Sequence, residues 1–225
     1  MLSVRRFVRG PGEKEDAGFT VIELVIALAI FSVFLTIVLS SIAAITKASS
    51  KVQVTAQSSS AELAAFQRLD HQIRYSDAIN FPGVGSPSGD PYVEFRTPAV
   101  SEASGITLCT QWRFDLTSHS LQQRTWNDVA GATPGAWQTN LTNVANDGGA
   151  AYPFQLRPAV GAGAQQLVFT VDSGNVRITG AKIISTFVAR NSSIQSPSNA
   201  DDHVAGASDT PVCLAGFTTT AGTRK

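Results

Sequence analysis

The longest apolar run of the chain covers residues 19–45, and it is interrupted only by Ser, Thr and one carboxylate, Glu23. At 1.5 Å of rise per residue, a helix over this run is about 40 Å long, which exceeds the ~30 Å hydrocarbon layer of a bilayer. The apolar part of a cleaved secretory signal usually has only about 7–15 residues. The run therefore predicts a membrane-spanning helix over residues 19–45.

The segment that follows predicts a continuation of the same helix. Residues 19–80 contain no Gly or Pro, and Pro82-Gly83 then marks a turn. Apolar residues at steps of three and four predict an amphipathic helix over residues 46–80. This apolar stripe consists of Leu63, Phe66, Leu69 and Ile73, and the polar side of the same turns holds Glu62, Arg68, Asp70 and Arg74. The two segments together predict one helix of about 55–60 residues.

Beyond Pro91 the pattern changes to short runs of strand character, at residues 92–96, 106–114, 121–126 and 166–171. The Asp-Ser-Gly-Asn segment at 172–175 predicts a hairpin turn into a further strand. Two stretches rich in Gly, Asn and Ser, residues 127–151 and 191–212, predict loops.

An antiparallel sheet laid against the amphipathic part of the helix would bury the apolar faces of both. The predicted fold class is therefore α+β: a long N-terminal α-helix packed on a C-terminal antiparallel β-sheet, with residues 81–225 forming a β-rich globular domain.

Basic residues flank the apolar run unequally, which predicts its orientation. Four precede it and two follow, namely Arg5, Arg6, Arg9 and Lys14 before it and Lys47 and Lys51 after it. Because basic flanks stay on the cytoplasmic side, the N-terminus is predicted inside and the β-rich domain outside the cytoplasmic membrane.

The charge balance gives no sign of a polyanionic partner, because 17 basic and 17 acidic residues cancel. Arg113 and Arg124 lie next to Trp112 and Trp126 in the sequence, and such a surface can stack nucleic-acid bases. The same pattern is more common on alternate faces of paired strands, so nucleic acid is an unlikely partner.

The two cysteines, Cys109 and Cys213, fit no zinc or redox motif. If their domain is exported, a disulfide between them is the natural interpretation. Two buried free thiols are the alternative.

No constellation of metal ligands or catalytic residues is visible in the sequence. His71, His119 and His203 are scattered, without metal-ligand spacing. Asp172 to Asn175 and Asp201-Asp202-His203 match no ordered calcium loop. We expect no cofactor, no metal and no enzymatic activity.

The heptapeptide Gly18-Phe19-Thr20-Val21-Ile22-Glu23-Leu24 resembles the class III signal of type IV pilins and type II secretion pseudopilins. The resemblance implies that residues 1–18 are a leader, cut by a prepilin peptidase between Gly18 and Phe19. It also implies N-methylation of Phe19 and a role for Glu23 in assembly, as partner of a neighbouring subunit's N-terminal amine. The alternative is a plain membrane anchor in which Glu23 lies at the cytoplasmic edge of the bilayer.

This resemblance also implies a function and partners. The chain is expected to be a structural subunit of a type IV pilus or pseudopilus, assembled with other pilin or pseudopilin subunits by inner-membrane machinery. Its length and the absence of Gly and Pro from residues 19–45 favour a minor subunit at the filament tip or at initiation. The alternative function is a tip module that binds a surface, a secreted protein or DNA.

Overall fold

The structure is a computed structural model that describes residues 18–84, 88–149, 151–175, 178–199 and 212–213. By its internal contacts the chain divides into two compact units, Met1–Ser50 and Lys51–Lys225. A single helix, α1 (Val21–Arg74), contributes residues to both. Each unit has its own chemistry, and they are described in turn.

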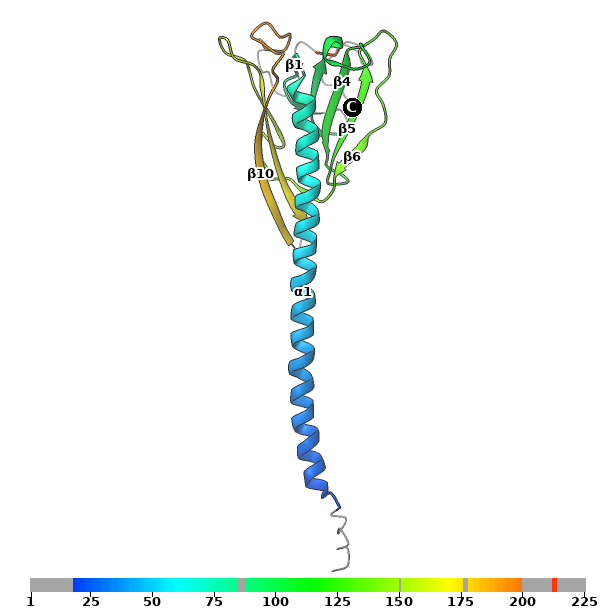
Figure 1. Cartoon of the computed structure of the whole chain (residues 1–225), viewed down its shortest axis with the longest axis vertical. Helices are drawn as coiled ribbons and strands as arrows, with labels where there is room; N and C mark the ends of the chain where they lie inside the picture. The colour runs from blue at the N-terminus through cyan, green and yellow to red at the C-terminus, as the bar shows by residue number, and fades with distance from the viewer. Residues whose placement is uncertain (1–17, 85–87, 150, 176–177, 200–211, 214–225) are drawn as a thin grey trace, which may run out of the picture. The chain divides into compact units, whose positions relative to one another are not determined.

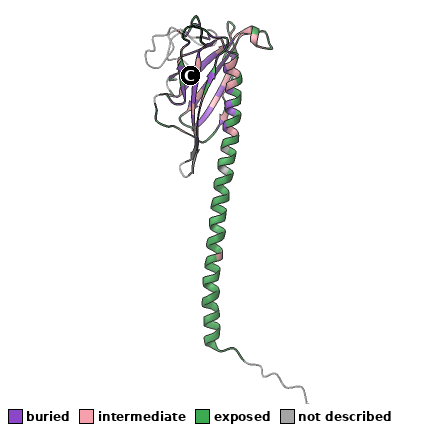
Figure 2. Ribbon diagram, turned by 60° about the vertical axis from the view of Figure 1, so that its left-hand side comes forward, coloured by how far each residue is buried: buried purple, intermediate pink, exposed green. Residues whose placement is uncertain are grey.

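In the first unit the described apolar residues of α1 are exposed, apart from Val38, which has intermediate exposure, and Figure 2 colours this part of the helix almost entirely as exposed. Even the least accessible of the large apolar residues exposed there, Leu35, has 40% of its surface free. By length and composition α1 is able to cross a membrane. Its hydroxyl groups bond to carbonyls three or four residues earlier, as in Ser32 to Ala29 (2.8 Å) and Thr36 to Ser32 (2.8 Å). These polar groups are therefore satisfied inside the helix, as an apolar environment requires.

The second unit contains two antiparallel sheets (Figure 1). Among the described residues, the first sheet has the order β1-β3-β4-β5-β6, with β2 also paired to β3. Its strands are β1 (Ala78–Ile79), β2 (Gly83–Val84), β3 (Pro91–Thr97), β4 (Leu108–Asp115), β5 (Ser120–Asn127) and β6 (Gln138–Leu141). A short 3-10 helix, η1 (Ala99–Ser101), follows β3.

The second sheet has the order β10-β9-β7, with β8 also paired to β9. Its strands are β7 (Val144–Ala145), β8 (Phe154–Arg157), β9 (Gln166–Asn175) and β10 (Ile178–Val188). Residues of both sheets and of the last turns of α1 share one hydrophobic core. The predicted α+β class, a long helix packed with antiparallel sheet, is confirmed.

The buried stripe of α1 has a different phase from the predicted one. Leu63 is 58% exposed, whereas Glu62 is completely buried. The other buried residues of the stripe are Ala65, Phe66, Leu69 and Ile73. Counted from Glu62, the positions are spaced i, i+3, i+4, i+7 and i+11, which places them on one face of the helix. The prediction that placed Leu63 inside and Glu62 on the polar side was wrong.

The helix ends at Arg74, earlier than residue 80, where the prediction placed its end. Its last carbonyls find partners from elsewhere in the chain: the Arg190 amide donates to Arg74 and the Asn191 side chain to Tyr75. Ser76 turns back onto the Ile73 carbonyl through its hydroxyl (2.7 Å). Asp77 and Ala78 then pair with Arg96 of β3. Because this pairing needs an extended backbone, the helix does not continue beyond Arg74.

Three loop and turn predictions also need correction. Residues 172–175 were predicted as a turn but belong to β9, where Ser173 pairs with Val144 and Asp172 with Lys182. The predicted loop at 127–151 contains β6 and β7, and β8 follows it without having been predicted. The predicted loop at 191–212 contains no strand in its described residues, and residues 200–211 lie outside them.

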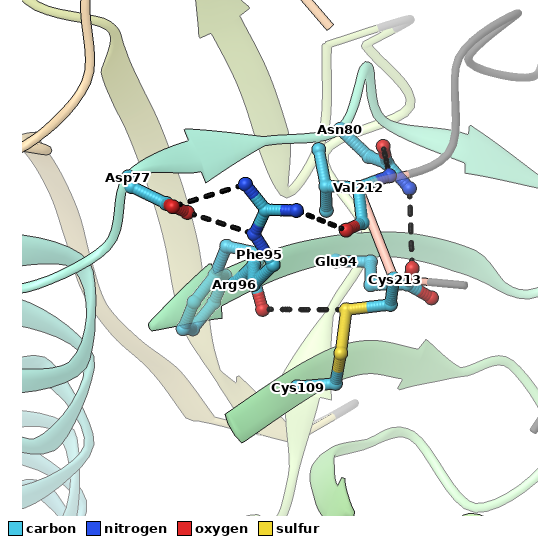
Figure 3. The surroundings of a disulfide bond; sticks show 8 residues. All are labelled: Asp77, Asn80, Glu94, Phe95, Arg96, Cys109, Val212 and Cys213. Atoms are coloured by element: carbon cyan, nitrogen blue, oxygen red, sulfur yellow. Dashed lines mark hydrogen bonds and ion pairs between the residues drawn. A yellow bond between two sulfur atoms is a disulfide. The ribbon is translucent and has the colours of Figure 1, made fainter. Parts of the chain in front are cut away.

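A disulfide joins Cys109 on β4 to Cys213, across 104 positions of sequence (Figure 3). The predicted bond is therefore confirmed. A second buried cluster, separate from the main core, consists of Ala78, Cys109, Trp126, Val212 and Cys213. Hydrogen bonds reinforce this anchor: the Val212 amide donates to Asn80 Oδ1 (3.0 Å), and its carbonyl accepts from Arg96 Nη1 (3.3 Å).

Candidate functional site

The strongest candidate site is the start of α1, where Thr20 and Glu23 form a reciprocal pair. The Glu23 amide donates to Thr20 Oγ1 (3.4 Å), and the Thr20 amide donates to Glu23 Oε2 (3.4 Å). The Thr20 hydroxyl also donates to Glu23 Oε2 (3.3 Å). This is a capping box, in which an N-cap hydroxyl and a Glu three residues later satisfy amides that the helix leaves open.

The capping box fixes where the Glu23 carboxylate lies. Because the N-terminal end of a helix carries partial positive charge, a carboxylate is stabilised there. Glu23 therefore lies within one turn of Phe19, on the same end of the helix. Phe19 is 88% exposed, so this end of the helix is open to a partner.

Gly18 has no local structural requirement to be glycine. A Cβ added at this position would meet no atom within 4 Å. Among the described residues, the structure thus gives no packing reason for glycine at position 18.

Comparison with protein-family models gives one match, to the prokaryotic N-terminal methylation motif at residues 14–39. The chain carries a prepilin-type methylation motif. The methylation motif covers Gly18, Phe19, Thr20 and Glu23, the residues that form the helix start described above. Comparisons with curated proteins and with solved structures found no match. With its long N-terminal helix packed on antiparallel sheet, the protein that carries this methylation motif is pilin-like.

The sequence analysis assigned roles to Gly18, Phe19 and Glu23, and it included Thr20 in the heptapeptide without assigning it a role. The missed signal was local: Thr-x-x-Glu ahead of an apolar run is the sequence pattern of a capping box. In the methylation motif, Thr20 therefore positions the carboxylate of Glu23 as well as starting the helix.

The Arg–Trp surface considered for nucleic acid does not form as the sequence suggested. Trp112 is completely buried in the main core, and Trp126 packs beside the disulfide. Arg113 and Arg124 both contact Trp137, each with its guanidinium carbon 4.2 Å from the ring centroid, and Arg124 also lies 6.0 Å from the ring centroid of Trp126. Trp137 is thus engaged in cation–π contacts within the chain.

The other candidate ligands stay apart. His71 packs against Tyr75, with the ring centroids 5.2 Å apart, and His119 lies near Phe114. His203, with Asp201 and Asp202, lies outside the described residues. In the part of the chain that the structure describes, no group of three His, Cys, Asp or Glu side chains is placed to hold a metal ion.

One further hollow lies at the C-terminal end of α1. It has a volume of about 410 Å³, and its lining includes His71, Tyr75, Thr97, Glu102 and Thr110. Tyr75 is 43% exposed there, so its ring is accessible at the rim. Hydroxyl, amide and carboxylate groups around an exposed aromatic ring could position a small polar ligand.

Proposed function

We propose that the chain is a subunit of a type IV pilus or pseudopilus that a prepilin peptidase cuts between Gly18 and Phe19. The observation that carries the proposal is the coincidence of the methylation motif with an outward-facing apolar helix and a capped Glu23. Phe19 would become the new N-terminus and receive the N-methyl group. Residues 1–18 would act as the leader.

Glu23 would be the assembly carboxylate. An ionised carboxylate in the apolar part of a bilayer costs about 2.5–3.5 kcal/mol or more, so it needs a partner. Cleavage before Phe19 creates an amine, and such an amine on a neighbouring subunit would supply the opposite charge. In the uncut chain the Thr20 amide and hydroxyl hold the same carboxylate oxygen. The neighbour would therefore compete with, or add to, the capping box.

The proposal extends to partners, orientation and place. The basic residues before the apolar run support a cytoplasmic N-terminus, with the second unit outside. Other pilin or pseudopilin subunits and the inner-membrane assembly machinery would be the partners. The length of the chain and the absence of Gly and Pro from residues 19–45 support a minor subunit at the tip or at initiation.

The test is the intact mass of the N-terminus, measured on protein from membranes that contain an active prepilin peptidase. The expected product begins at N-methylated Phe19, and replacing Gly18 with Val leaves the chain uncut. Glu23→Ala is expected to be cut but not assembled. A wild-type chain that keeps residues 1–18 would reject the proposal.

A tip-located binding module is a second candidate function, supported by the hollow beside Tyr75 and Glu102. Its test is attachment of cells that carry the wild-type chain or the variants Tyr75→Ala and Glu102→Gln. Loss of attachment with unchanged filament number would support a binding role, and unchanged attachment would remove it.

A further inference from the structure

Glu62 is a charged residue type placed where the fold requires an apolar one. It occupies the first position of the buried stripe of α1, one turn before Phe66. Its side chain has no exposed surface, and neither carboxylate oxygen has a partner in hydrogen-bonding geometry. An unpaired ionised carboxylate in such a position is among the most costly groups a core can contain.

Among the described residues, the groups that act on Glu62 supply no positive charge. On β9, the alternate residues Leu167, Phe169 and Val171 are buried. Ser173, the next residue on the same face of the strand, is also buried and lies beside Glu62. The next residue back, Asp172, has the same sign of charge as Glu62 and acts on it. Along α1, the residues one turn further on are Ala65 and Phe66.

Lys182, a described cation on the second sheet, is already paired. Lys182 of β10 lies across from Asp172 in the ladder, and its Nζ contacts Asp147 Oδ2 at 3.1 Å. Tyr152, the other titratable group at this end of the sheet, donates its hydroxyl to the Ala145 carbonyl. Among these described groups of β9, β10 and the segment after β7, the one positive charge is paired with Asp147. The charge of Asp172 repels the ionised form of Glu62.

Burial raises the pKa of Glu62, and the Asp172 charge raises it further, while the Ser173 hydroxyl opposes both. A protonated carboxyl is the form that this packing accommodates best, because a neutral group is less costly to bury.

We propose that Glu62 is a proton-binding site built into the contact between α1 and β9, and that loss of its proton loosens the β7–β9 end of the second sheet from the helix. The step is a simple acid dissociation: the O–H bond breaks, and the proton leaves to water. The carboxylate that remains needs water or a cation, and separation of Ser173 from α1 admits water. Because Val144 pairs with Ser173, β7 would move with it.

The sign of the pH effect follows from linkage. The folded chain holds the Glu62 proton to higher pH than the unfolded chain does, so its contribution to stability is complete below about pH 4.3. That contribution is lost as the pH rises through the pKa of the folded state. The effect is opposite to that of an ordinary ion-paired carboxylate.

The test uses the whole chain in detergent micelles and two readouts. Infrared difference spectra should show a protonated carboxyl band, absent from Glu62→Gln, that disappears well above the pH at which free glutamic acid ionises. Hydrogen exchange of the Ser173 amide, compared with Glu62→Gln at the same pH, should accelerate over the same pH range. Glu62→Gln is neutral and nearly isosteric, so it should keep this amide protected at high pH.

Two matched variants make the result decisive. Ser173→Ala removes the hydroxyl that favours the charged form, so the midpoint should move to higher pH. Glu102→Gln, at a partly exposed carboxylate, should change neither readout. A carboxyl band that titrates at the ordinary value, or exchange at Ser173 that follows pH identically in wild type and Glu62→Gln, would overturn the proposal.

Discussion

Trp112 donates a hydrogen bond from its indole Nε1 to the side-chain oxygen of Gln72, 2.9 Å away. Trp112 lies on β4 with no exposed surface, and Gln72 belongs to the last turns of α1. The amide nitrogen of Gln72 in turn donates to Gln123 on β5 (3.2 Å). One glutamine therefore satisfies the indole N–H of the largest fully buried side chain and links α1 to two strands.

We expect Gln72→Met to destabilise the fold by about 1–3 kcal/mol, because the buried indole N–H loses its acceptor. Denaturant unfolding in detergent measures this loss. Gln138→Met, at an exposed position of β6, is the control and should change little. In the double variant with Trp112→Phe the two losses should be less than additive, and full additivity would show that the bond contributes nothing.

The disulfide should contribute a large part of the stability of the second unit. For a loop of about 100 residues, the chain-entropy model gives about 4–5 kcal/mol, and removal of native bonds typically costs about 2–5 kcal/mol. We expect Cys109→Ser/Cys213→Ser to lower Tm, and a reductant to lower the Tm of the wild type alone. If the reductant changes both proteins equally, the bond is not the cause.

Asp115 should support the fold except in acid. Burial raises its pKa, but the amides of Ser118 and Thr117 and the charge of Arg113 together outweigh burial, and the net pKa is lowered. The folded state therefore binds this proton less readily than the unfolded state, whose pKa is about 3.9. The stabilisation is present above that value and is lost as the pH falls through the folded-state pKa.

The measurement is the free energy of unfolding between about pH 5 and pH 2, the region where a lowered Asp pKa acts. Asp115→Asn should show a shallower loss in acid than the wild type. Thr139→Ala, at an exposed position of β6, removes no titratable group and should retain the wild-type slope. Equal slopes for all three proteins would contradict the assignment.

Gly135 allows the segment before β6 to approach β5 closely. Its amide donates to the Thr125 carbonyl (3.1 Å), and a Cβ there would lie 2.9 Å from the same oxygen. We expect Gly135→Ala to cost about 1 kcal/mol or more, because a backbone oxygen has to move. Thr133→Ala, exposed in the same segment, is the control for the unfolding measurement.

A change in the environment of Trp137 would accompany this loss, since Trp137 follows Gly135 by two residues and packs on Arg113 and Arg124. Its fluorescence, measured in a variant with Trp112 and Trp126 replaced by Phe, reports that change. An unchanged stability and spectrum would mean that the segment has room for a methyl group.

The parts of the fold that were predicted correctly have strong local signals. The apolar run sets the first half of α1, and alternation sets β3, β4, β5 and most of β9. The short strands β6, β7 and β8 have no such signal. They exist because long neighbours, β5 and β9, offer them backbone partners distant in sequence.

The phase of the helix stripe shows the same limit. Leu63 and Glu62 are adjacent, and both fit a step of three or four to Phe66. Hydrophobicity alone selects Leu63, yet the position of β9 buries Glu62 instead. For the N-terminal methylation motif the local signal was sufficient, because the whole motif lies within the continuous segment 14–39.

The bond between Cys109 and Cys213 also has a mechanical consequence. It closes a covalent ring that contains most of β4 and all of β5 to β10. Tension applied between α1 and the C-terminal end of the chain passes through the two sulfur atoms and leaves the ring unloaded. At about 3.4 Å per residue, roughly 350 Å of chain is thereby withheld from extension. A subunit pulled in this way lengthens only through residues outside the ring, and its two sheets keep most of their strands while the load lasts.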